Sequence, residues 1–182
     1  RVIEMTLPAS PQLAAMLLAI VFYAATAVIS AIFHRNRNIL AAVYAVCLVT
    51  SVLAILANLS CLVTITDDTF RLPLGLPSIG LHMRLDVLSA FFGLIINLGV
   101  LAASIYGLGL DRTRDLTGRI EPFFPAFAAA MNLVLLADDA FGFPFSWELM
   151  SLSSWALVVS RHTDAESRHA GHVYLVMAAI GT

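Results

Sequence analysis

The sequence predicts an all-α membrane protein, a polytopic bundle of transmembrane helices with about five full spans and a truncated sixth. Hydrophobic residues make up 60% of the chain and charged residues only 12%. The mean hydropathy of +0.90 lies above the range of soluble globular domains. The apolar residues also gather in stretches near the roughly 20 residues that a helix needs to cross a bilayer. We therefore expect residues 1–182 to form a single membrane domain.

The first half of the chain contains three apolar stretches long enough to span a bilayer. They cover residues 13–33, 39–63 and 86–110. The short polar run "HRNRN" separates the first two. Asp86 stands at the start of the third, where an acid can cap free backbone amides and complement the positive end of the helix dipole.

The connection between the second and third spans, "TITDDTFRLPLGLPSIGLHMR", is too short and too broken to span. Its proline and glycine residues exclude a continuous helix through Pro73 to Gly80. Its alternation of Thr and Ile predicts strand pairing. We expect a short extracytoplasmic hairpin here.

The second half of the chain predicts three further spans, at residues 120–137, 140–159 and 170–182. The last of these is only about 20 Å of helix, too short to cross about 30 Å of hydrocarbon. The chain is therefore expected to be the N-terminal portion of a longer subunit, cut within a helix at Thr182.

Proline and aspartate residues mark the limits of the fourth span. Pro122 and Pro125 fall in its first turns, where a missing amide hydrogen is tolerated. Asp138 and Asp139 are predicted to form a solvated turn and to cap the next helix. Because so few residues separate the fourth and fifth spans, the two should form a tight antiparallel pair.

Arginine counts predict the orientation, since the chain has no lysine. Three arginines fall on the side of the N-terminus and the hairpin. Loops 34–38, 111–119 and 160–169 hold the other seven: Arg35, Arg37, Arg112, Arg114, Arg119, Arg161 and Arg168. By the positive-inside rule, these loops are cytoplasmic and the N-terminus lies outside, in a multi-pass protein of the inner (plasma) membrane.

Several classes of partner and cofactor are not indicated. The net charge of −2 provides no basic surplus for nucleic acid. Cys47 and Cys61 are about 21 Å apart along a helix, far beyond disulfide reach. The sequence has no metal, haem or iron–sulfur ligand spacing, so we expect no cofactor in this chain.

Glu148 is a lone acid inside the apolar stretch "FSWELMSLSSWALVV". A charge at the centre of a bilayer costs at least about 3 kcal/mol, so its presence indicates either a proton or ion path or a protonated carboxyl satisfied inside the bundle. Ser151 lies on the same helix face and could hydrogen-bond to it. His172 would be a proton carrier if it faced the bundle interior.

That stretch resembles the fifth span of the antiporter-like, proton-translocating membrane subunits of respiratory complex I, multisubunit cation/proton antiporters and membrane-bound hydrogenases. The hydrogenase-4 and formate hydrogenlyase membrane subunit is the most similar branch. Two flanking pieces agree in order and spacing. "RLDVLSAFFGLIINLGVLAASIYGLG" resembles the third span of the family, and "RHAGHVYLVMAAIGT" resembles the start of its sixth. The resemblance covers residues 84–182.

The resemblance implies roles for three acids. Glu148 would be the essential glutamate of a proton half-channel, Asp86 matches an aspartate that heads the third span, and Asp138 falls at a polar position before the fifth. The family's partner lysine lies on a seventh span, beyond Thr182.

The implied function is proton translocation within a respiratory or hydrogenase-type redox complex, of the NADH-quinone oxidoreductase or formate hydrogenlyase kind. The chain would be a non-catalytic subunit, with the electron carriers on other subunits. Its partners would be other membrane and peripheral subunits, the lipid bilayer, and protons or Na⁺.

A non-conducting membrane scaffold that anchors a soluble redox arm is the alternative, with Glu148 a satisfied core acid. An intramembrane enzyme has no support, because neither an HExxH nor a GxSxG motif occurs.

Overall fold

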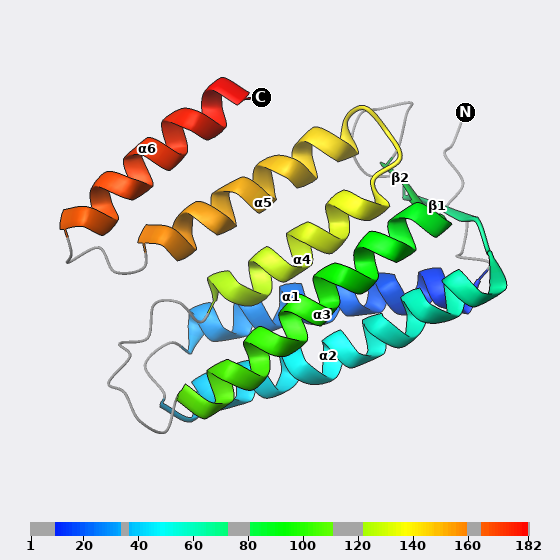
Figure 1. Ribbon diagram of the computed structural model, residues 1–182, viewed down its shortest axis with the longest axis horizontal. Helices are drawn as coiled ribbons and strands as arrows, with labels where there is room; N and C mark the ends of the chain where they lie inside the picture. The colour runs from blue at the N-terminus through cyan, green and yellow to red at the C-terminus, as the bar shows by residue number, and fades with distance from the viewer. Residues whose placement is uncertain (1–9, 34–36, 73–80, 111–121, 160–164, 182) are drawn as a thin grey trace.

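The computed structural model describes residues 10–33, 37–72, 81–110, 122–159 and 165–181. The described residues form helices that lie roughly side by side, with a two-stranded hairpin at one end (Figure 1). In chain order the elements are α1 (Pro11–Ile32), α2 (Arg37–Thr64), β1 (Asp68–Leu72), β2 (Leu81–Leu85), α3 (Val87–Leu110), α4 (Phe123–Leu136), α5 (Gly142–Val158) and α6 (Ala165–Gly181).

Three of the described helices are long and apolar enough to cross a membrane, which identifies the chain as a membrane protein. They are α1, the segment Ala41–Thr64 of α2 and the segment Val87–Gly109 of α3. The apolar helix α4 is shorter, with 14 residues or about 21 Å, and α5 and α6 have 17 residues each. Helix α6 begins at Ala165 rather than at residue 170, because the polar run "AESRH" is helical as well.

Helices α1 to α4 pack against one another as a four-helix core, and the two remaining helices are added on one side. Helix α5 packs against α4, and α6 packs against α5 (Figure 1). The fourth and fifth helices are antiparallel neighbours, as predicted. One face of α5 and most of α6 therefore lie outside the core.

A buried polar cluster joins three of the core helices. The phenol of Tyr23 on α1 donates to Asn97 Oδ1 on α3, at 3.1 Å. Asn97 Nδ2 donates to Asn132 Oδ1 on α4, at 2.8 Å. Asn97 Nδ2 also donates to Gly93 O within α3. Asn132 Nδ2 donates to Ala128 O within α4 and, at 3.5 Å, to Asn97 Oδ1. We call Tyr23, Asn97 and Asn132 the central amide cluster; all three side chains are fully buried, and such interhelical bonds hold membrane helices together.

Close approach of α2 and α3 depends on a glycine. A Cβ atom at Gly93 would lie 2.6 Å from Asn58 Oδ1. Asn58 is itself fully buried and donates to Ala54 O, at 2.8 Å, and to Met16 Sδ, at 3.3 Å. Gly93 therefore lets the α3 backbone pack directly on a polar side chain of α2.

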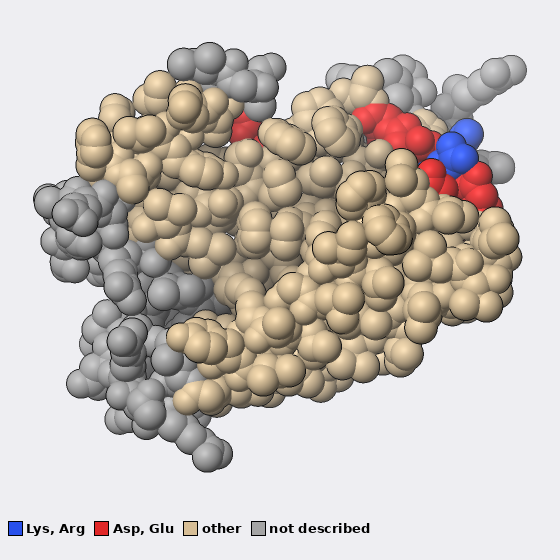
Figure 2. Space-filling model, in the orientation of Figure 1, with Lys and Arg blue, Asp and Glu red and all other residues tan. Residues whose placement is uncertain are grey.

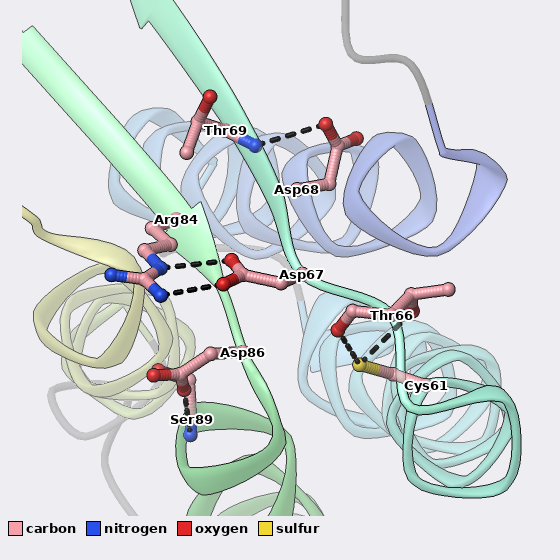
Figure 3. A network of polar contacts seen from close by, with 8 residues as sticks. All are labelled: Cys61, Thr66, Asp67, Asp68, Thr69, Arg84, Asp86 and Ser89. Carbon is pink, nitrogen blue, oxygen red and sulfur yellow. Dashed lines mark hydrogen bonds and ion pairs between the residues drawn. The ribbon is translucent and has the colours of Figure 1, made fainter.

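The predicted strand pairing is present in the hairpin. Strands β1 and β2 are antiparallel, with Asp68 opposite Leu85 and Leu72 opposite Leu81. The segment 73–80, where a helix was excluded, lies outside the described residues. An ion pair crosses the open end of the hairpin, where Arg84 Nε donates to Asp67 Oδ1 at 2.8 Å (Figure 3).

Hydrogen bonds tie the hairpin to the nearby helix ends. The Ser10 amide, at the N-cap of α1, donates to Asp68 Oδ2 at 2.6 Å. The thiol of Cys61, near the end of α2, donates to Thr66 O at 3.4 Å. Asp86 follows β2 directly and accepts the Ser89 amide at 2.7 Å, which is N-cap geometry for α3 (Figure 3).

Among the described residues on the visible face, most charged side chains gather at this end of the molecule (Figure 2). The Arg84 guanidinium, by its hydrogen bonds and charge, holds the pKa of the Asp67 carboxyl below its ordinary value. The hairpin end is thus polar, and the helices beyond it are apolar.

Candidate functional site

Helix α5 packs through small residues. Its buried positions include Gly142, Ser146 and Ser153, and α4 is its main neighbour. Ser146 donates to Gly142 O at 2.7 Å, and Ser153 donates to Leu149 O at 2.8 Å. Because both hydroxyls are satisfied within α5, this face can lie close to another helix without an unpaired donor.

The other side of α5 is aromatic and open. Phe141 stacks on Phe145 with ring centroids 6.2 Å apart, and Phe143 contacts Trp147 at 5.9 Å. All four side chains are exposed in this chain. Glu148 is also exposed. It lies two residues after Ser146, about 200° around the helix, so it points away from the buried face.

Glu148 lines a cleft between α5 and α6 with a volume of about 340 Å³. Its polar groups are the carboxylate of Glu148, the hydroxyl of Ser151 and the phenol of Tyr174; its lining residues are Glu148, Ser151, Leu152, Tyr174, Leu175 and Ala178. Among the described residues, neither a hydrogen bond nor an ion pair reaches the Glu148 carboxylate. The cleft is thus lined by an acid that has no partner in the described part of the chain and by two residues with hydroxyl groups.

The cleft only partly matches the sequence-based expectation. Ser151 is at the cleft and is buried, but the hydrogen bond that it could make to Glu148 is not formed. His172 is exposed and is not among the residues that line the cleft. Tyr174 was not predicted. The sequence did contain a signal for it, because the phenol of a tyrosine in an apolar helix needs a polar partner.

The three aspartates of the predicted helix starts lie at the hairpin end, away from the cleft. Asp138 is exposed, as predicted for a solvated turn. Asp139 is partly buried, and its carboxylate accepts the amides of Phe141, at 2.9 Å, and Gly142, at 2.6 Å, at the start of α5. Burial alone would raise the pKa of Asp139, but the backbone amides of Gly142, His82 and Phe141 outweigh it and hold the pKa below its ordinary value.

A second groove, between α1 and α2, has few polar groups that could take part in proton transfer or catalysis. A depression of about 410 Å³ between α1 and α2 is lined mainly by Ala, Leu and Phe side chains, with Gln12 and Ser60 as its polar members. Across the described part of the chain, no three His, Cys, Asp or Glu side chains lie close enough together to hold a metal ion. The cleft with Glu148 is therefore the better candidate site.

Comparison with known proteins identifies relatives of this chain. No family model matches it. Hydrogenase-4 component B of Escherichia coli strain K12 is 40% identical over 104 residues, which are 56% of this chain and 15% of that protein. An uncharacterized protein of Mycobacterium tuberculosis strain H37Rv is 37% identical over 107 residues, which are 58% of this chain and 17% of that protein.

The matched segment is thus a small part of each relative. It nevertheless covers more than half of this chain, at an identity that indicates common ancestry. The chain is a homologue of hydrogenase-4 component B, and its resemblance to the antiporter-like membrane subunits is confirmed.

Proposed function

We propose that this chain is part of a proton-translocating membrane subunit of a hydrogenase-type or respiratory redox complex, and that Glu148 carries the proton. The observation that supports this most directly is a carboxylate in a cleft between α5 and α6 with no partner among the described residues. The relationship to hydrogenase-4 component B supports the kind of complex.

The proposed proton exchange at Glu148 follows from the free-energy cost of placing a charged carboxylate in lipid. A charged carboxylate there costs at least about 3 kcal/mol, and intramembrane acids accordingly mark ion paths or are paired. In the central amide cluster, buried polar side chains of three helices are paired with one another. Glu148 has no such partner within the described chain, so its carboxyl is free to accept a proton and to pass it on.

Two hydroxyls can assist this transfer. Ser151 and Tyr174 line the same cleft as Glu148. Each hydroxyl can donate one hydrogen bond and accept others, so a chain of hydrogen bonds through water can form there. We assign Glu148 as the proton-carrying residue and these two as groups that line its path.

The proposed arrangement places α1 to α5 across the inner membrane, with α6 as the start of a sixth span. The N-terminus and the hairpin lie outside, and the loops after α1, α3 and α5 lie in the cytoplasm, in accord with the positive-inside rule. Other membrane and peripheral subunits would provide the redox cofactors. The transported ion is H⁺, with Na⁺ as the alternative coupling ion.

The test is proton transport by the intact complex with Glu148→Gln in the full-length subunit. Glutamine keeps the size of the side chain but cannot bind and release a proton. We expect the complex to assemble and to lose most proton uptake in membrane vesicles, while Asp138→Asn, which changes an exposed acid outside the cleft, transports normally. Normal uptake with Glu148→Gln would instead establish the non-conducting scaffold.

A further inference from the structure

The turn between α4 and α5 is fastened to strand β2. Asp139 Oδ2 accepts the backbone amide of His82 at 2.8 Å, across 57 residues of sequence. The Asp138 amide donates to His82 O at 3.0 Å. Met83 and Ala137 form an antiparallel β-bridge. Residues 137–139 therefore run along the free edge of β2, on the side away from β1.

The same carboxylate starts α5. Asp139 Oδ1 accepts the amides of Phe141 and Gly142, which begin that helix. One side chain therefore connects the hairpin to the first turn of α5. The contact is close as well as polar, because a Cβ atom at Gly142 would lie 2.6 Å from Leu81 Cδ1 and 2.8 Å from Asp139 Oδ2.

Elsewhere α5 has few polar links to its surroundings. Ser146 and Ser153 on its buried face donate to carbonyls of α5 itself. The small side chains let α5 pack closely on its neighbour, but these hydroxyls form no directional bond to another helix that would fix its rotation or height. Its N-terminal end is the exception, since Asp139 ties it to β2.

Glu148 is close enough to this end to follow its position. It lies six residues after Gly142, about 9 Å along a rigid helix. A rotation or axial shift of the first turn therefore moves the carboxylate within the cleft by a comparable amount.

We propose that His82 of β2 and Asp139 form a latch that fixes the rotation and height of α5, and that Asp139 is thereby a positioning residue for Glu148. This inference rests on the proposed role of Glu148 in proton transport. The latch is distinct from the helix cap, because the cap uses the amides of Phe141 and Gly142 and the latch uses the amide of His82.

The experiment removes the latch and leaves the cap. His82→Pro removes the backbone N–H group that donates to Asp139 Oδ2. Proline is tolerated at this position because the amide of His82 points away from the partner strand. His82→Ala is the matched control, because it loses the imidazole and keeps the amide. Asp139→Asn is a second variant that breaks the latch. The side-chain oxygen of the asparagine can still cap α5, but its NH2 group then faces the His82 N–H, and two donors cannot form a hydrogen bond.

Each variant is made in the full-length subunit of the intact complex. Two properties are measured: the pH profile of proton uptake, and the infrared carboxyl band that Glu148→Gln abolishes. We expect His82→Pro and Asp139→Asn to shift both the band and the profile and to slow uptake about tenfold, since a misplacement of about 1 Å can cost as much as 100-fold. His82→Ala should match the wild type.

The outcomes separate the latch from the proposed function. An unchanged band and profile in both assembled latch variants would overturn the latch. If Glu148→Gln transports normally, the proposed function fails. The infrared carboxyl band of Glu148 then tests the latch by itself: a shifted band in the latch variants supports it, and an unchanged band overturns it.

Discussion

Two polar regions inside this protein are built in opposite ways. The central amide cluster is fully buried between α1, α3 and α4, and its side chains bond to one another and to nearby carbonyls. The cleft between α5 and α6 holds an exposed carboxylate with no hydrogen bond from the described residues. The side chains of the cluster bond across helices and can hold them together, whereas the proposed role of Glu148 requires a carboxyl group whose bonding positions stay available.

The largest expected effect on stability is in the central amide cluster. Asn97→Ala removes the bonds to both Tyr23 and Asn132, so the Tyr23 hydroxyl hydrogen and Asn132 Oδ1 lose these partners in a buried setting. We expect a loss of about 3 kcal/mol, since each unsatisfied buried group costs about 1–3 kcal/mol and each interhelical bond up to about 2. Unfolding of the detergent-solubilised subunit by heat or denaturant measures it. A loss below about 0.5 kcal/mol would show that the cluster does not hold the helices together.

An intermediate effect is expected at the hairpin on acidification. The folded-state pKa values of Asp67 and Asp139 are lowered, so their stabilising contributions are present above the ordinary aspartate pKa, near 4, and are lost as the pH falls through the folded values. We expect the amides of His82 and Asp138 to lose protection in hydrogen exchange below about pH 4, after correction for the intrinsic rate. The amides of α2 and α3 should stay protected. Uniform loss of protection over the whole chain would contradict a local opening.

The smallest effect on stability is expected in the cleft. Glu148 makes no hydrogen bond within the described chain, so Glu148→Gln should change the unfolding free energy by less than about 0.5 kcal/mol. The same unfolding assay measures it, with Asn97→Ala as the contrasting variant. A destabilisation as large as that of Asn97→Ala would make Glu148 a packing residue and remove the distinction between the two regions.

The sequence predicted the elements well because apolar runs and helix breakers act locally. The helices fall within or near the predicted stretches, the Pro/Gly-rich connection contains paired strands, and Asp86 has N-cap geometry at α3. Helix α6 begins at Ala165, five residues before the predicted span at 170–182, because helical conformation continues beyond the apolar stretch into a polar run.

The parts of the site that depend on contacts between distant residues could not be predicted. Asp139 was interpreted as a solvated cap, but its second oxygen binds the amide of His82, which is a backbone group and leaves no trace in the residue types. The meeting of Tyr174 with Glu148 depends on the register of α6 against α5. Asn97 and Asn132 lie in apolar runs, and only the packing of α3 on α4 brings them together.

The most direct test of the difference between the two regions is the number of protons taken up per redox turnover by the assembled complex. It is measured in vesicles for Glu148→Gln and, in parallel, for Asn97→Leu, which keeps the approximate size of the side chain. We predict that Glu148→Gln assembles at wild-type level and takes up few protons per turnover. Asn97→Leu should assemble poorly, yet the complex that does assemble should keep the wild-type ratio. A wild-type ratio with Glu148→Gln would contradict the assignment of Glu148 as the proton-carrying residue.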